Sequence, residues 1–152
     1  MTDPTVLERI TQALCAGLAT VPVGDGTAAV FRGRRNGIDA ARFPAYRVNR
    51  GDFESEQASS AHVVNRQVFH VEGLVVGDDD ETADRAAIAL AEGVRGLIET
   101  DWTLGGLAVN STVRAGGPDD AGTEDVPYIV GVLVEIDVEF WTKPGDPTAL
   151  AP

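Results

Sequence analysis

Few side chains in this sequence are of the types that carry out catalysis or hold metals. His62 and His70 lie eight residues apart on one extended run, so their side chains share a face at a separation of about 27 Å. That distance is too large for joint metal ligation, and no nearby cysteine or His-x-His spacing assists either histidine. Cys15, the single cysteine, lies close to the apolar side of a predicted helix and has no identifiable basic partner. We therefore expect a small buried thiol rather than a nucleophile, and ordinary histidines on a sheet surface.

The glycine-rich and acidic stretches lack the spacing of known ligand sites. Residues 24–26 (GDG) and 116–117 (GG) stand outside any GxGxxG or GxxxxGKS/T pattern, so they give no support to a phosphate loop. The acidic clusters at 78–80 and 119–125 do not have the alternating ligands of an EF-hand calcium loop. A helix cap and a solvated loop are the better interpretations of these two clusters. The sequence predicts no enzyme activity, no cofactor and no metal site.

The composition is that of one soluble globular domain with an acidic surface. The 152 residues carry a formal net charge of −12, with 43% hydrophobic and 24% charged residues. This excess of negative charge repels phosphate, which argues against sequence-reading nucleic-acid binding. No stretch is long enough to span a bilayer, and the first residues lack the basic and apolar regions of an export signal. The single cysteine excludes an internal disulfide.

Hydrophobic periodicity predicts two helices and several strands. The first helix begins after the N-cap Asp3 and extends to about residue 19, and the second follows the acidic residues 78–81 and ends near residue 100. Strands are expected at 28–32, 44–48 (an edge strand), 61–76, 107–114 and 127–141, and loops at 32–43, 51–60 (polar and mobile) and 115–125. This order predicts an α+β fold, with a mostly antiparallel sheet of four to five strands and two helices packed on one face. We assign residues 1–143 to a single domain and residues 144–152 to a flexible C-terminal tail.

Two of the expected strands, 61–76 and 127–141, are unusually long. The second has an unbroken apolar alternation on one face, and its other face ends in three acidic residues: Glu135, Asp137 and Glu139. Fifteen residues extend about 50 Å, whereas a compact chain of this length has a diameter of roughly 40 Å. Such strands must either curl, with bulges at Gly73 and Gly131, or project and bury their apolar residues against another copy. We favour the second possibility, which predicts an obligate homo-oligomer.

Residues 101–107 (DWTLGGL) connect the second helix to the next strand. Asp101 and Thr103 can bond nearby backbone N–H groups, and the two glycines allow left-handed backbone geometry, so the stretch is typical of a tight turn. We expect Trp102 and Leu104 to anchor this turn, either in the core or in a subunit interface.

The same turn and the elements around it resemble a known family. A helix that ends in an acidic residue, a T-L-G-G turn with a strand, and a final long strand are similar to the tail terminator proteins of long-tailed bacteriophages. The matching segments cover nearly the whole domain as a pattern: 6–18, 44–48, 63–76, 88–101, 103–106 and 128–141. Residues 101–106 are the stretch that is distinctive by itself. The head-completion proteins of the same phages look similar, with a comparable layout of two helices and one sheet.

The resemblance implies a structural role in the virion, at the head-proximal end of the tail, after assembly in the host cytoplasm. Proteins of this family form a hexameric ring that caps the tail tube, stops its polymerisation and docks on the head connector. The implied partners are further copies of this chain, the tail tube protein and the connector protein, with DNA passing through the ring and no membrane. The family has no catalytic residues that could be carried over.

Candidate residues for these contacts come from this sequence itself. The subunit-interface candidates are Trp102, Leu104, Leu133, Phe140 and Trp141. The lumen-facing candidates are Glu135, Asp137 and Glu139, whose charge would keep passing DNA from adhering to the ring. A solvent-facing sheet surface is the alternative interpretation of these three carboxylates. Whether the arginines at 32–35 meet the acidic residues of a neighbour or only water stays open.

Three other functions stay open as well. Within the same particle, the chain could be a head-completion protein or a tail-tube subunit. From another class, a small intracellular enzyme or ligand-binding domain would have a polar-lined cavity between helices and sheet and would be a monomer or dimer. A dimeric adaptor of a bacterial secretion apparatus related to tail tubes is the third.

Overall fold

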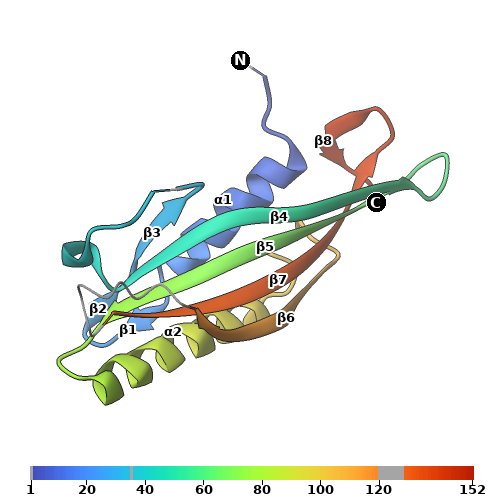
Figure 1. Cartoon of the computed structure of the whole chain (residues 1–152). Coiled ribbons are helices and arrows are strands. Elements are labelled where there is room, and N and C mark those ends of the chain that lie inside the picture. The colour runs from blue at the N-terminus through green and yellow to red at the C-terminus, as the bar shows by residue number, and fades with distance from the viewer. Residues whose placement is uncertain (1, 35, 120–128) are drawn as a thin grey trace.

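A six-stranded sheet is the central element of the computed structural model, which describes residues 2–34, 36–119 and 129–152 (Figure 1). The helices are α1 (Val6–Leu18), α2 (Asp80–Thr100) and the short 3-10 helix η1 (Ala40–Arg42). The strands are β1 (Pro22–Val23), β2 (Gly26–Thr27), β3 (Ala29–Arg32), β4 (Ala45–Gln57), β5 (Val63–Val76), β6 (Asn110–Asp119), β7 (Ile129–Lys143) and β8 (Asp146–Leu150). The strand order in the sheet is β3-β4-β5-β7-β6, with β8 paired to β7, while β1 and β2 pair separately.

Neighbouring strands of the sheet run antiparallel, except β3 and β4, which are parallel. The predicted α+β class, with two helices and a mostly antiparallel sheet, is therefore confirmed. The sheet has more strands than the four to five that we expected, because β8 extends it. The strand expected at 44–48 is also not an edge strand, since β3 pairs with its first residues on one side and β5 on the other.

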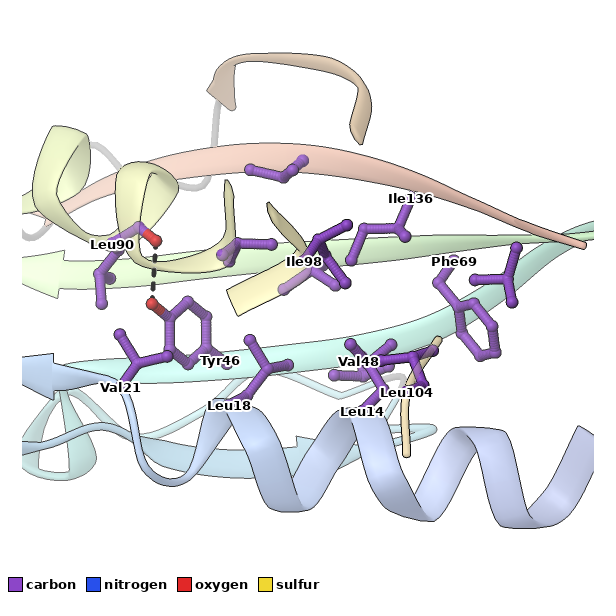
Figure 2. Packing of buried hydrophobic residues seen from close by; sticks show 14 of the residues in the cluster. Leu14, Leu18, Val21, Tyr46, Val48, Phe69, Leu90, Ile98, Leu104 and Ile136 are labelled. Atoms are coloured by element: carbon purple, nitrogen blue, oxygen red, sulfur yellow. Dashed lines mark hydrogen bonds between the residues drawn. The ribbon is translucent and has the colours of Figure 1, made fainter. Parts of the chain in front are cut away.

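Both long helices contribute to one hydrophobic core on a single side of the sheet (Figure 2). From the helices, the core contains Val6, Ile10, Leu14 and Leu18 of α1 and Leu90, Val94 and Ile98 of α2. Tyr46, Phe69 and Ile136 enter it from the three central strands, and each is fully buried. The Tyr46 hydroxyl donates a hydrogen bond of 2.9 Å to the carbonyl oxygen of Leu90, which ties β4 to α2. We call this side of the sheet the helix face and the other side the open face.

Side-chain acceptors fix the start of both helices. Thr5 is the N-cap of α1, and its hydroxyl accepts a hydrogen bond of 3.1 Å from the backbone N–H of Glu8. The predicted cap, Asp3, lies two residues too early, because the threonine reaches the third helical N–H from its own position. Asp79 caps α2 by accepting from the N–H of Thr82 at 2.7 Å, and this bond lowers the pKa of its carboxyl group. The acidic cluster at 78–80 thus acts as a helix cap, as predicted.

The two long strands pair with each other. β5 and β7 are antiparallel over fourteen consecutive residue pairs, from Val63 opposite Thr142 to Val76 opposite Ile129, without a shift in register. The apolar residues of β7 that face the helices are at most 9% exposed: Val132, Val134, Ile136, Val138 and Phe140. Our expectation that these strands need another copy to bury their apolar residues is wrong, because α1 and α2 bury them within the chain. Bulges at Gly73 and Gly131 are also absent from this pairing.

β4 and β5 form a long hairpin whose tip extends past the helices (Figure 1). Residues 51–60, which we expected to be mobile, include the second half of β4, and residues 53–57 pair with residues 63–67 of β5. The sequence pattern missed this half-strand because it is solvent-exposed from Asp52 onward and so has no apolar alternation. A shift in register between Arg50 and Phe53 separates the two halves of the strand.

Residues 144–152 form part of the sheet and are not a flexible tail. After a turn at Gly145 (φ 74°), β8 returns along β7, with Leu150 opposite Thr142. The Arg9 guanidinium of α1 donates a hydrogen bond of 2.6 Å to the carbonyl oxygen of Thr148, and Leu150 packs against the core. The prediction failed because the segment is short and proline-containing, and only its position beside β7 makes it a strand.

Candidate functional site

The open face of the sheet carries rows of charged side chains that run across the strands. One row joins Arg47 of β4, Glu72 of β5 and Leu133 of β7, and the Arg47 and Glu72 side chains form an ion pair. The next row joins Asn49, His70 and Glu135. Because Arg47 and Glu72 oppose each other across strands, their row stabilises the sheet locally, and both rows leave a polar, partly exposed surface.

The three lumen candidates, Glu135, Asp137 and Glu139, lie together on this open face, as the alternation of β7 predicts. Two of them, Glu135 and Glu139, have a close side-chain neighbour in β5. A Glu135 carboxylate oxygen lies 3.6 Å from Nδ1 of His70, and a Glu139 oxygen lies 3.4 Å from Nε of Arg66. The acidic row is therefore less negative than the sequence of β7 alone indicates, because β5 places the Arg66 guanidinium beside Glu139.

Of the interface candidates, Leu133 and Trp141 are half-buried on the open face. Trp141 forms an edge-on contact with the His62 ring at 5.2 Å between centroids, and its indole N–H donates to Glu139 at 3.1 Å. Phe140 and Leu104 are 3% and 6% exposed and belong to the core of their own chain. These two side chains are therefore not interface residues, because a neighbouring copy cannot reach them without opening the core.

The turn at 101–106 has the geometry that its sequence predicts. The Asp101 carboxylate accepts hydrogen bonds from the N–H groups of Thr103 (3.0 Å) and Gly105 (2.9 Å) and from the Thr103 hydroxyl. The hydroxyl bond is the main cause of a lowered Asp101 pKa. Leu104, Gly105 and Gly106 all have positive φ angles (50°, 76° and 84°), and this left-handed path turns the chain from α2 back toward the sheet. The carboxylate serves a structural purpose here.

Trp102, the remaining interface candidate, is 53% exposed beside a groove between α2 and β6. One part of this groove is a cavity of about 350 Å³ between the outer side of α2 and the helix face of β6 and β7. It contains Ile88, which is 55% exposed, and the glycines 116 and 117, whose missing side chains keep it open. Arg95 and Val113 also line an adjoining hollow that reaches Trp102. The sequence contains one indication of this groove: Ile88 is apolar but does not lie on the side of its helix that is buried in the core.

The side chains considered first for chemistry do not converge. The His62 ring contacts Ser59, Trp141 and the carbonyl oxygen of Pro152, whereas His70 lies beside Glu135 and Gly51. Cys15 is half-buried against the core, and burial raises the pKa of its thiol, which makes it a poor nucleophile.

No group of three or more His, Cys, Asp and Glu side chains that could hold a metal ion occurs within residues 2–34, 36–119 and 129–152. The loop predicted at 115–125 is part of β6 up to Asp119, and the rest of that acidic cluster lies outside the described residues. Neither described helix is long and apolar enough to cross a membrane.

The structure thus offers two candidate surfaces for contact with other molecules: the charged open face, and the α2–β6 groove with its exposed apolar residues. Large exposed apolar side chains gather at the groove side, where Ile88, Trp102 and Val109 are 45–55% exposed. Comparison with known proteins adds no relative to this description, since the sequence matches no protein-family model and a search of curated proteins finds no match for it.

Proposed function

We propose that this chain is a ring-forming structural subunit of a bacteriophage tail, of the tail terminator type. In this role, copies of the chain close into a ring, six in number by resemblance, on the head-proximal end of the tail tube. The ring stops polymerisation of the tube and presents a surface to the head connector. The resemblance of the segments around residues 101–106, described above, names the family.

One observation carries the proposal: in the part of the chain that the structure describes, the sheet has helices on one side only. Three strands of 13, 14 and 15 residues span the molecule, and their open face is largely polar, with two ion pairs, although Ala45, Val68 and Leu74 are buried on it. A sheet with one buried and one polar face can line an aqueous channel, as the inner surface of a ring requires. The strand length itself gives no support, because the strands satisfy one another within the chain.

In such a ring the open face would line the channel through which DNA passes. Glu135, Asp137 and Glu139 lie on that face together with Glu72, and their charge would repel the phosphate backbone. The ion pairs with Arg66 and Arg47 moderate this repulsion. Asp137 forms no ion pair among the described residues, so it is the carboxylate on which the effect depends most.

The mass of the protein in solution tests the proposal. Native mass spectrometry and light scattering over a range of concentrations should reveal a six-fold species, and electron microscopy should show rings with a central opening. A chain that stays monomeric at high concentration would exclude the ring. Long tubes formed by the chain alone would identify a tail-tube subunit instead. A ring that binds a connector but no tube would identify a head-completion protein.

The α2–β6 groove favours one function of another class, a small ligand-binding domain. Its volume of about 350 Å³ and its apolar floor, with Asp84 and Arg95 among the lining residues, suit a small amphipathic molecule. This function predicts a monomer or dimer whose thermal stability rises with a ligand that competes for the groove. Widening of Ile88 to Trp would then abolish the ligand effect, with no change in the mass of the protein.

A further inference from the structure

The charges of this acidic chain are strongly segregated. Residues 32–50 contain six of the twelve basic residues and one acidic residue, whereas residues 78–101 contain eight acidic and two basic residues. The first segment contains the last residue of β3, η1 and the start of β4, and the second forms α2 with its two ends. Figure 1 shows β3 and the α2–β6 side at opposite margins of the molecule. The molecule therefore has a basic side and an acidic side.

The basic side, which we call the basic edge, consists of β3 and residues 33–50. A hollow of about 540 Å³ is lined there by Gly33, Arg34, Arg47, Asn49 and Arg50. Arg34 and Arg42 both lie over the Phe31 ring, at 5.1 and 5.5 Å from its centroid. Arg32 and Arg47 have carboxylate partners within the chain, but Arg34, Arg42 and Arg50 form no ion pair with another described residue. Unpaired guanidinium groups of this kind bind carboxylates well.

The acidic side, which we call the acidic edge, consists of β6 and the outer side of α2. The exposed carboxylates Asp84, Glu92 and Glu99 line the groove and its adjoining hollow, among the apolar residues described above. Glu92 is shared with Arg95 at 3.8 Å, while Asp84 and Glu99 have no ion-pair partner among the described residues. The Ser111 hydroxyl also lines the hollow and is buried without a hydrogen-bond partner in the described part of the chain. The exposed carboxylates of Asp84 and Glu99 can therefore pair with cationic groups of another molecule.

The sheet places both edges at the same level along its strands. One cross-strand row runs from Phe31 in β3 through Arg47, Glu72 and Leu133 to Gly117 in β6. Phe31 belongs to the basic edge, where it lies under Arg34, and Gly117 lines the groove at the acidic edge. β3 and β6 are also the two terminal strands of the sheet order, so no further strand among the described residues pairs with the outer side of either. A second copy placed beside the first would bring the two edges to the same height.

We propose that the basic edge of one copy docks on the acidic edge of the next, in a head-to-tail contact that closes the ring. This inference rests on the proposed function and adds to it the surface by which the copies meet. A symmetric contact of either edge with itself would oppose like charges, which costs several kcal/mol and disfavours a two-fold dimer. A contact between two different edges instead continues from copy to copy until it closes. Ile88 and Trp102 then become buried at the contact.

Charge reversal tests this pairing. Arg34→Glu with Arg50→Glu places two carboxylates at the hollow of the basic edge, and Asp84→Arg with Glu99→Arg places two guanidinium groups along the groove of the acidic edge. Each double variant alone opposes like charges, so its ring should dissociate at a protein concentration at least about tenfold higher than the wild type requires. An equimolar mixture of the two double variants restores opposite charges at every contact. It should form rings in which the two variants alternate, which native mass spectrometry detects as equal numbers of each.

Glu54→Arg with Glu56→Arg provides the matched control, because it reverses two exposed carboxylates on the hairpin tip, outside both edges, and should leave the ring intact. Circular dichroism and thermal melting establish that every variant is folded. A wild-type chain that forms no ring overturns the proposed function and this contact together. A ring that survives both reversals overturns only the assignment of the edges. Monomeric variants that fail to recombine overturn the pairing of the basic with the acidic edge.

Discussion

The two faces of the sheet are built from the same strands but are held together by different interactions. On the helix face, Ile136 of β7 is fully buried among residues of both helices and of β5. One residue further, Asp137 points to the open face, where it lies between Val68 of β5 and Thr112 of β6. The helix face therefore accounts for stability through apolar burial, and the open face and the sheet edges are available for contact with other molecules.

The largest expected effect comes from shortening a side chain on the helix face. Ile136→Ala removes a fully buried side chain from a closed core and should lower the free energy of unfolding by about 2–5 kcal/mol. Asp137→Ala, on the open face, should change it by no more than about 0.5 kcal/mol. Urea unfolding of both variants measures the difference. Equal losses at the two positions would contradict the division of roles between the faces.

Much of this division can be predicted from the sequence of β7 alone. Its alternation correctly assigns the apolar face and the acidic face, and the helix periodicity of residues 6–18 and 80–100 locates both helices. The partners of the strands were not predictable in this way, because pairing of β5 with β7 joins residues more than fifty positions apart in the chain. The periodicity of a strand shows which of its faces is apolar, but it does not show which other strand pairs with it.

The functional surfaces were predicted less well, for the same reason. The acidic row was visible in the sequence, but the side chains beside it, Arg66 and His70, come from β5. The sequence does not show whether an apolar residue such as Leu104 or Phe140 lies in the core of its own chain or in an interface with another copy. The basic and acidic segments can be found in the sequence by their charge. Only the sheet order and the register show that they lie at opposite margins of the sheet and at the same position along its strands.

High pH provides a second test of the helix face, through Tyr46. Burial raises the pKa of its hydroxyl to about 12, whereas an exposed tyrosine in the unfolded chain titrates near pH 10. Below pH 10 the hydroxyl is protonated in both states, and its contribution to stability is complete. Between pH 10 and 12 the unfolded chain releases this proton first, so the free energy of unfolding should fall by about 2–3 kcal/mol.

Tyr46→Phe serves as the control for this pH dependence. The variant loses the hydrogen bond to Leu90, which should cost about 1 kcal/mol at pH 7. Its stability should then decline less steeply than that of the wild type above pH 10, because the titrating group is gone. Identical slopes for the two proteins in urea titrations at pH 9 to 12 would show that the hydroxyl is not protected by burial.

Two glycines of α2 sharpen the comparison on a single helix. A Cβ atom at Gly93 would lie 2.4 Å from Val21 Cγ1 and 3.1 Å from the Tyr46 hydroxyl. A Cβ atom at Gly96 would have no atom within 4 Å beyond the backbone of its own helix. Gly93→Ala should therefore destabilise the protein by about 1–3 kcal/mol through overpacking. Gly96→Ala should stabilise it by about 0.5–1 kcal/mol, because alanine favours the helix and meets nothing. Thermal melting of both variants decides whether only the inner side of α2 is tightly packed.

The smallest expected effect lies on the open face, in the pair of Arg66 and Glu139. Their atoms are 3.4 Å apart and the Arg66 side chain is 58% exposed, so water screens the interaction and side-chain entropy opposes it. A double-mutant cycle with Arg66→Ala and Glu139→Ala should give a coupling energy of no more than about 0.5–1 kcal/mol, which declines as salt is raised. Glu139→Ala also removes the acceptor of the Trp141 indole, so the single variants will differ and only the cycle isolates the pair. A salt-independent coupling of several kcal/mol would mean that the open face is itself desolvated in solution, as it would be if another copy of the chain covered it.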